Sequence, residues 1–399
     1  MIPNKEILDK YADVLVKFAL NDFKGIKKGD VVMLQVPECA KPLLVSLYTK
    51  VLEAGGHPIT RILPDDMSRI IFEIGSDEQI TFFPRDMIKA RVDTVDHAVS
   101  IIAETNKEEL KGIDPKKIMM ASKSAKEYRE WLEEKENKGK FSWTLALYGT
   151  EAMAKEANMP LEEYWNEIIK ACFLDYDDPV SKWQEVTKEI ERVKKELNSM
   201  PIDTLRVESE DTDLIIGLDE NRKWLGGSGR NIPSFELFIS PDYRRTQGKI
   251  KFNQPLYRYG NLIDGITLEF KDGKVTNFSA KKGEDVLKEM IATEGANRVG
   301  EFSLTDSRLS RITKFMGETL FDENVGGEQG NTHIALGNAY KDSYPKEDRA
   351  DLTKKQWDDM GYNESVVHTD IVSTYKRKVT ATLKDGSKKV IYEDGKFLV

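Results

Sequence analysis

The pattern of the sequence changes at Pro201, and this change limits the chain to folds with two dissimilar parts. Before Pro201, apolar runs of strand length alternate with stretches of helical periodicity. After it, short alternating runs are separated by turns rich in Gly, Asn and Asp. We therefore predict an α/β domain over residues 1–200 and a β-rich α+β domain over residues 201–399.

The first part contains a β-α-β unit near its start. The apolar run at residues 31–36 predicts a buried strand, residues 40–56 have helical periodicity and end in glycine, and residues 58–63 predict a second strand. Strands joined through a helix run parallel when they share a sheet, so we expect a largely parallel sheet. Further strand-like runs are found at residues 99–104 and 143–148.

The second part follows a strongly helical, charged segment at residues 160–200. Near the end of the chain, Asp385-Gly386 and Asp394-Gly395 predict two successive hairpin turns. Helices are expected among the strands, for example at residues 283–295. This pattern is typical of an antiparallel, β-rich domain.

Composition and charge exclude several classes of protein. No apolar run approaches the roughly 20 residues of a membrane span, and the first residues predict an amphipathic helix rather than a cleaved leader. The net charge of -9 argues against a nucleic-acid partner. The only cysteines, Cys39 and Cys172, suit a reducing compartment. We expect a cytoplasmic protein that binds neither membranes nor nucleic acids.

A nucleotide site in the first part has little support from the sequence. The Gly-Gly-His turn at residues 55–57 is too short and wrongly placed for a dinucleotide-binding fingerprint, which stands between a strand and a helix. Titration with a nucleotide is therefore expected to give no binding.

Residues able to bind metal ions gather in four short segments of the second part. His368 and Asp370 make the strongest local case, because residues i and i+2 of a strand point to the same face. A carboxylate among Val366, Val367 and Ile371 must be compensated by a cation, either a bound metal or a Lys or Arg from elsewhere. The residues of interest in the other segments are Glu236, Glu301, His333 and Tyr340.

Each of these other residues has an ordinary structural alternative. Glu236 fits the exposed side of an edge strand, Glu301 fits the cap of a turn, and His333 fits a hydrogen-bonded structural histidine. His333 and Tyr340 would share a face if their segment were helical, although Gly337 argues against a helix.

Taken together, these residues offer nitrogen and oxygen ligands but no thiolate. Two histidines, three carboxylates and a phenol suit Zn, Co or Mn. They are too many for one tetrahedral ion that also holds a water, and they fit two ions that share a carboxylate.

Four segments in order resemble the M29 family of thermophilic metallo-aminopeptidases, also called the AmpS or aminopeptidase T type. The segments are NIPSFELFISP, GANRVGEFSL, TLFDENVGGEQGNTHIALGNAY and VVHTDIV. Like the family, this chain has no H-E-x-x-H motif, and its α/β first half fits the family's two-domain architecture. The resemblance implies two divalent metal ions per chain, with the ligands Glu236, Glu301, His333, Tyr340, His368 and Asp370. It also implies a homodimer enclosing a restricted cavity, which would favour short peptides with a free N-terminus.

The general base stays open among three carboxylates. Glu323 and Glu328 both precede His333 in a Gly-rich stretch, and an ordinary loop glutamate is an equal alternative for each. We assign the role to Glu328, which lies in the better-matching segment. Glu301 is the alternative among the ligands.

The sequence thus predicts a metal-dependent aminopeptidase, a hydrolase that cleaves the N-terminal peptide bond with a metal-activated water. A carboxylate would take the proton of the water and return it to the leaving amine. The alternative is a metal- or peptide-binding protein of the same fold without turnover. Release of a free amino acid from a short peptide, with and without added metal, separates the two.

Overall fold

The computed structural model describes residues 3–219, 221–258, 261–345, 349 and 352–399. They form two compact units, Met1–Gln184 with Ser228–Pro233 and Glu185–Gly227 with Ser234–Val399. The chain passes from unit 1 to unit 2 inside helix α10 (Pro179–Ser199), whereas we placed the boundary just after this helix. It returns once to add strand β7 (Asn231–Ile232) to unit 1.

Unit 1 is built on a five-stranded parallel sheet with the order β2-β1-β3-β4-β7. Its other strands are β1 (Val31–Pro37), β2 (His57–Leu63), β3 (His97–Ile102) and β4 (Ser142–Leu147). All four runs that predict strands form strands with nearly the expected bounds. The prediction of an α/β first part with a largely parallel sheet is confirmed.

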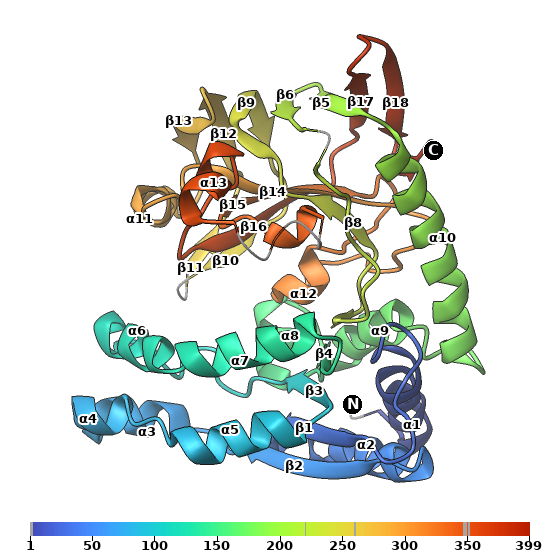
Figure 1. Cartoon of the computed structure of the whole chain (residues 1–399), viewed down its shortest axis with the longest axis vertical. Helices are drawn as coiled ribbons and strands as arrows, with labels where there is room; N and C mark the ends of the chain where they lie inside the picture. The colour runs from blue at the N-terminus through green and yellow to red at the C-terminus, as the bar shows by residue number, and fades with distance from the viewer. Residues whose placement is uncertain (1–2, 220, 259–260, 346–348, 350–351) are drawn as a thin grey trace. The chain divides into compact units, whose positions relative to one another are not determined.

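Helices make the connections between these strands (Figure 1). The predicted N-terminal amphipathic helix is α1, which buries Leu8, Tyr11 and Ala12. The helix of the β-α-β unit is α2, which ends just before Gly55, a residue with a φ of 82°. The bounds are α1 (Lys5–Asp13), a π-helical turn (Val14–Phe18), a 3-10 turn (Glu38–Ala40), α2 (Lys41–Glu53), α3 (Met67–Ile74), α4 (Asp77–Ile80), α5 (Arg85–Thr94), α6 (Pro115–Ser124), α7 (Lys126–Asn137), α8 (Glu151–Glu156) and α9 (Leu161–Ala171). Among the described residues, no helix is both long enough and apolar enough to span a membrane.

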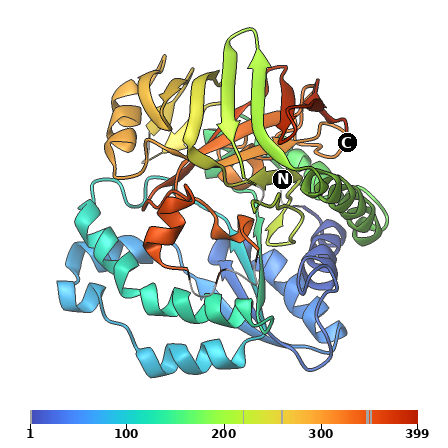
Figure 2. The same cartoon turned by 45° about the horizontal axis from the view of Figure 1, so that its top comes forward.

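Unit 2 is β-rich, and its strand pairs are antiparallel. An eight-stranded sheet has the order β13-β12-β9-β6-β5-β17-β18-β19, and β10 pairs with β11. These strands are β5 (Ile202–Ser209), β6 (Thr212–Gly217), β9 (Asp242–Lys251), β10 (Leu256–Arg258), β11 (Asn261–Ile263), β12 (Thr267–Lys271), β13 (Lys274–Ser279), β17 (Lys378–Leu383), β18 (Lys388–Glu393) and β19 (Lys396–Phe397). The β5–β6 hairpin is light green in Figure 2. The predicted β-rich second part is confirmed.

Both turns predicted near the C-terminus are present. The first joins β17 to β18 and the second joins β18 to β19. In the second turn Asp394 and Gly395 both have positive φ, 50° and 75°, as a two-residue hairpin loop between right-twisted strands requires.

A separate four-stranded sheet with the order β16-β15-β14-β8 forms the buried centre of unit 2. Its strands are β8 (Glu236–Ile239), β14 (Val299–Thr305), β15 (Asn331–Gly337) and β16 (His368–Ser373). Figure 1 shows β14, β15 and β16 side by side. All seven residues of β14 and all seven of β15 are buried, so polar side chains on these strands have no access to bulk water.

Short helices complete unit 2. The predicted helix after residue 283 is α11 (Glu284–Ala292). The others are α12 (Thr319–Asp322), a 3-10 turn (Lys341–Ser343) and α13 (Lys354–Asp359). Glu323 lies in the turn that directly follows α12.

Candidate metal centre

One face of the four-stranded sheet carries most of the predicted ligands. In the register, Ser303 of β14 lies opposite both His333 of β15 and Phe238 of β8. Glu301 lies opposite Ala335, which in turn lies opposite Asp370 of β16. Because successive side chains of a strand alternate between faces, residues an even number of positions from these share their face. Glu236, Glu301, His333, His368 and Asp370 therefore project together.

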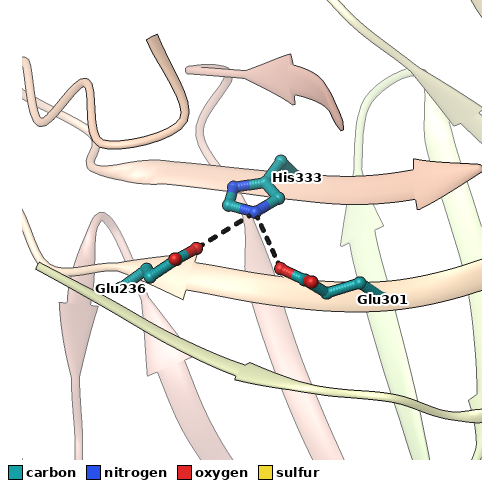
Figure 3. Close-up of side chains that lie close together, drawn as sticks. All are labelled: Glu236, Glu301 and His333. Carbon is teal, nitrogen blue, oxygen red and sulfur yellow. Dashed lines mark hydrogen bonds and ion pairs between the residues drawn. The ribbon is translucent and has the colours of Figure 1, made fainter. Parts of the chain in front are cut away.

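A first group forms around His333. Its Nε2 is 3.2 Å from Glu236 Oε2 and 3.3 Å from Glu301 Oε1. Figure 3 shows the two carboxylates approaching the same ring nitrogen from different strands. Glu236 and Glu301 are 7% and 3% exposed, and His333 is fully buried. Glu236 is thus not on an exposed face, and Ser303 donates a hydrogen bond to its Oε2 at 3.0 Å.

A second group forms around His368. Its Nε2 is 3.5 Å from Asp370 Oδ1 and 3.6 Å from Glu301 Oε2. The predicted pairing of His368 with Asp370 along one strand face is present in β16. Glu301 belongs to both groups, since one of its oxygens faces each histidine. Within each group, the candidate ligand atoms lie within 4.8 Å of one another.

The histidine rings are oriented by hydrogen bonds on their outer nitrogens. His368 Nδ1 donates to the carbonyl oxygen of Asn338 at 2.8 Å, and His333 Nδ1 donates to Asn331 Oδ1 at 3.4 Å. Both Nε2 atoms are therefore left to face the carboxylates, as second hydrogen bonds commonly arrange for metal-binding histidines. Asn331 is thus the residue that orients His333.

A glycine at the end of β15 lets the backbone just before His368 come close to this strand. Gly337 lies opposite His368 and has a φ of 112°. A Cβ at this position would be only 1.9 Å from the carbonyl oxygen of Val367. Glycine is therefore required here by both conformation and space.

The buried carboxyl and imidazole groups of the cluster shift one another's pKa values. Burial raises the pKa of Glu301 to about 7, helped by the charges of Glu236 and Asp370 and opposed by the hydrogen bond with His333. For His368, the effect of burial is outweighed by Asp370 and Glu301, and the pKa rises to about 9. The pKa of His333 is also raised well above its usual range, because Glu236 and Glu301 outweigh burial. His368 lowers the pKa of Asp370 despite burial.

This donor set fits a bound divalent cation. In the described part of the chain, no lysine or arginine forms an ion pair with Glu236, Glu301 or Asp370, so the Lys or Arg alternative for Asp370 has no counterpart there. Imidazole nitrogens and carboxylate oxygens of this number and closeness are typical ligands of divalent metals. A bound cation would take the place of the protons on these buried carboxyl and imidazole groups.

Tyr340 lies beside the second group but not for the reason considered from the sequence. Residues 331–337 form a strand, so no helical face joins Tyr340 to His333. The ring of Tyr340 instead packs on those of His368 and Phe238, with centroid distances of 4.7 and 5.7 Å. Its backbone N–H donates to Ser240 Oγ at 2.8 Å, which fixes its place after the strand.

The two candidate bases are in different surroundings. Glu323 is buried, and its pKa is raised well above the usual range by burial and by the charges of Glu236 and Asp370. Glu328 is exposed, and among the described residues no hydrogen bond or ion pair joins it to the cluster. Of the two carboxyls, only Glu323 is buried, and its pKa responds to the charges of the cluster.

A family model described as thermophilic metalloprotease (M29) matches residues 4–397. The chain belongs to this family. The resemblance seen in the sequence is thereby confirmed, and with it the prediction of a hydrolase that acts on peptide bonds. The M29 model spans both units, so the α/β unit belongs to the family's architecture as well.

Individual relatives agree with the M29 assignment. Aminopeptidase 2 of Geobacillus stearothermophilus is 29% identical, with 97% of each chain covered. Aminopeptidase T of Thermus thermophilus is 28% identical, with 99% of each chain covered. The solved structure of wild-type AmpT from Thermus thermophilus matches with a TM-score of 0.83 at 24% identity, covering 99% of this chain and 100% of that one. That likeness shows a shared fold.

Together these findings make the M29 chain a metal-dependent aminopeptidase, as the sequence predicts. The alternative of a binding protein without turnover is not favoured. The buried groups around His333 and His368 are the candidate place for the divalent metal.

Proposed function

We propose that the chain removes the N-terminal residue of short peptides and holds two divalent metal ions, Zn, Co or Mn, at the cluster. The observation that supports this most strongly is the position of Glu301, with one oxygen near each histidine. A carboxylate shared in this way suits two neighbouring ions rather than one. The proposed ligands are Glu236, Glu301, His333, Tyr340, His368 and Asp370.

Bound divalent ions supply Lewis acidity that polarises the scissile carbonyl and acidifies the attacking water. The side chains of the protein would bind these ions and keep the ligand atoms in position. The ligand carboxylates and Nε2 atoms are held in place by the sheet and by Asn331 and the Asn338 carbonyl. Such prior orientation avoids reorganisation during the reaction.

For proton transfer we propose Glu323 in place of Glu328. A general base must reach the reacting water. Glu323 is a buried carboxyl whose pKa is raised by the charges of the cluster as well as by burial. Burial in this acidic surrounding raises the pKa of Glu323, so its ionised carboxylate is a stronger base than an exposed one. Once it has taken a proton, the carboxyl can return it. It would take the proton of the attacking water and give it to the leaving amine. Glu328 gains no support for this role, because it is exposed.

We also propose that acidic side chains whose charge the metal ions do not neutralise select a free N-terminus. A peptide's α-ammonium is attracted by carboxylates, whereas an acetylated N-terminus carries no charge. We propose further that the protein is a cytoplasmic homodimer. Both cysteines are free, which fits a reducing compartment. Light scattering after size exclusion would show the oligomeric state directly.

The experiment that tests the proposal compares a short peptide with its N-acetylated form. The metal-free protein should be inactive, and adding Zn, Co or Mn should restore release of the first amino acid from the free peptide alone. Elemental analysis should find two metal equivalents per chain. Equal cleavage of both peptides would contradict the aminopeptidase proposal, and a single equivalent would contradict the metal pair.

A further inference from the structure

The turn that carries Glu323 is not part of the ligand sheet, so something must fix its place relative to the ligands. It follows α12, and the next three residues lead into the loop before β15. Two fully or almost fully buried asparagines, Asn324 and Asn331, make the contacts that matter here.

Asn331 joins the turn to His333. Its Nδ2 donates to the carbonyl oxygens of Glu323 and Val325, at 2.7 and 2.9 Å. Its Oδ1 accepts from His333 Nδ1 at 3.4 Å. Because the amide nitrogen faces two carbonyls, the side chain has one orientation, and its oxygen is directed at the imidazole.

Asn324 joins the same turn to the strand of Glu236. Its Oδ1 accepts from the backbone N–H of Phe235, the residue before Glu236, at 2.7 Å. Its Nδ2 donates to the carbonyl oxygen of Leu320 at 3.2 Å and to Glu323 Oε1 at 3.4 Å. Hydrogen bonds thus hold Glu323 at its side-chain carboxyl as well as at its backbone carbonyl.

We infer that Asn324 and Asn331 are positioning residues that together fix the Glu323 carboxyl relative to His333 and Glu236. The inference rests on the proposed role of Glu323. Each amide uses its donor on the Glu323 turn and its acceptor on a ligand strand. An aspartate keeps the acceptor, removes the donor and adds a negative charge. N324S and N331S add no charge and therefore distinguish loss of the contact from the effect of that charge. A displacement of about 1 Å at a reacting group is enough to cost a large part of the rate.

The experiment uses N324D, N331D and N331A in the metal-loaded chain, with N253D as the matched control. Asn253 also bonds through both amide atoms, to Thr374, outside the cluster. We expect N324D and N331D to lower kcat about 10- to 100-fold, with metal content and KM little changed. N253D should leave kcat unchanged. N331A, which also removes the acceptor for His333, should in addition alter the visible absorption spectrum of the Co-substituted protein.

The outcomes separate this inference from the proposed role of Glu323. Unchanged kcat in N324D and N331D would overturn the positioning inference. It would also be overturned if kcat fell only in parallel with thermal stability and the loss of stability were no larger than that of N253D. If E323Q keeps its activity, the proposed base is wrong, while the Co spectrum of N331A still tests the contact to His333. The uncharged variants N324S and N331S replace the aspartate variants if those do not fold.

Discussion

Glu301 and His333 meet at 3.3 Å across neighbouring strands although neither lies directly opposite the other. Glu301 faces Ala335 in the register and His333 faces Ser303, so the two are diagonal neighbours. This offset leaves the small side chain of Ala335 between Glu301 and Asp370. The carboxylate of Glu301 can therefore reach both histidines.

Replacing Glu301 by glutamine should abolish peptidase activity and leave the fold intact. Glutamine has nearly the same shape as glutamate but no charge. The substitution would therefore remove a carboxylate from both ligand groups at once. Activity is expected to fall at least about 100-fold, with reduced metal content by elemental analysis. E289Q, at an exposed position of α11, is the control. Full activity of metal-loaded E301Q would remove Glu301 from the site.

Metal binding should weaken as the pH falls. Without metal, the pKa of Glu301 is about 7 and that of His368 about 9, so both hold protons in part of the neutral range. A cation binds only after these protons leave, so affinity should rise from about pH 6 to about pH 9 and then level off. Calorimetry in two buffers of different ionisation enthalpy measures the released protons. Heats that do not depend on the buffer would argue that the metal binds elsewhere.

E323Q and E328Q should behave differently. Loss of a general base typically costs about 10²- to 10⁴-fold in rate, so E323Q should lose kcat to this extent with its metal content unchanged. E328Q should match the unaltered protein. Steady-state kinetics on one peptide decides between them, and the reverse result would return the role to Glu328.

Y340F should weaken metal binding without disturbing the fold. The ring contacts with His368 and Phe238 remain, and only the phenol oxygen is lost. We expect affinity, measured by competition with a chelator, to fall about 10-fold. An unchanged affinity would mean that Tyr340 only packs against the site.

Replacing Gly337 by alanine should destabilise unit 2 by more than about 2 kcal/mol. The new Cβ would collide with the Val367 carbonyl in a conformation that alanine disfavours. G386A is the matched control, because Gly386 also has positive φ, at 83°, but open space around it, and should cost about 1 kcal/mol. Urea unfolding of both variants measures the difference. Equal losses would show that the close approach at Gly337 relaxes easily.

Much of the fold follows from local patterns in the sequence. The apolar runs that became β1, β3 and β4 carry their own signal, since largely buried strands need continuous apolar residues, whereas β2 lies at the edge of the sheet and is mostly exposed. The turns at Gly386 and Gly395 are equally local. The apolar residues of the segment 231–241 form two strands, β7 in one sheet and β8 in another. Nothing local distinguishes one strand from two that are separated by Pro233.

Five of the predicted ligands lie close together in the structure, but their geometry was less predictable from the sequence. His368 and Asp370 share a strand face by simple alternation, so their pairing could be foreseen. The burial of Glu323 and the exposure of Glu328 could not be foreseen, because they depend on which part of a Gly-rich loop is covered by distant strands. The hydrogen bonds of Asn324 to Phe235 and of Asn331 to Glu323 fix that burial. Asn324 next to Glu323 was the available signal, since a buried asparagine needs several partners.

The burial of β14 and β15 has a consequence for how the protein would lose activity. Glu301 and His333 sit in strands whose residues are all buried and which pair with a neighbour on each side. Their amides should exchange with deuterium only when the whole of unit 2 opens, because no small local opening exposes them. Thermal inactivation and global unfolding of this unit should therefore proceed together, with no folded but inactive form accumulating on the way.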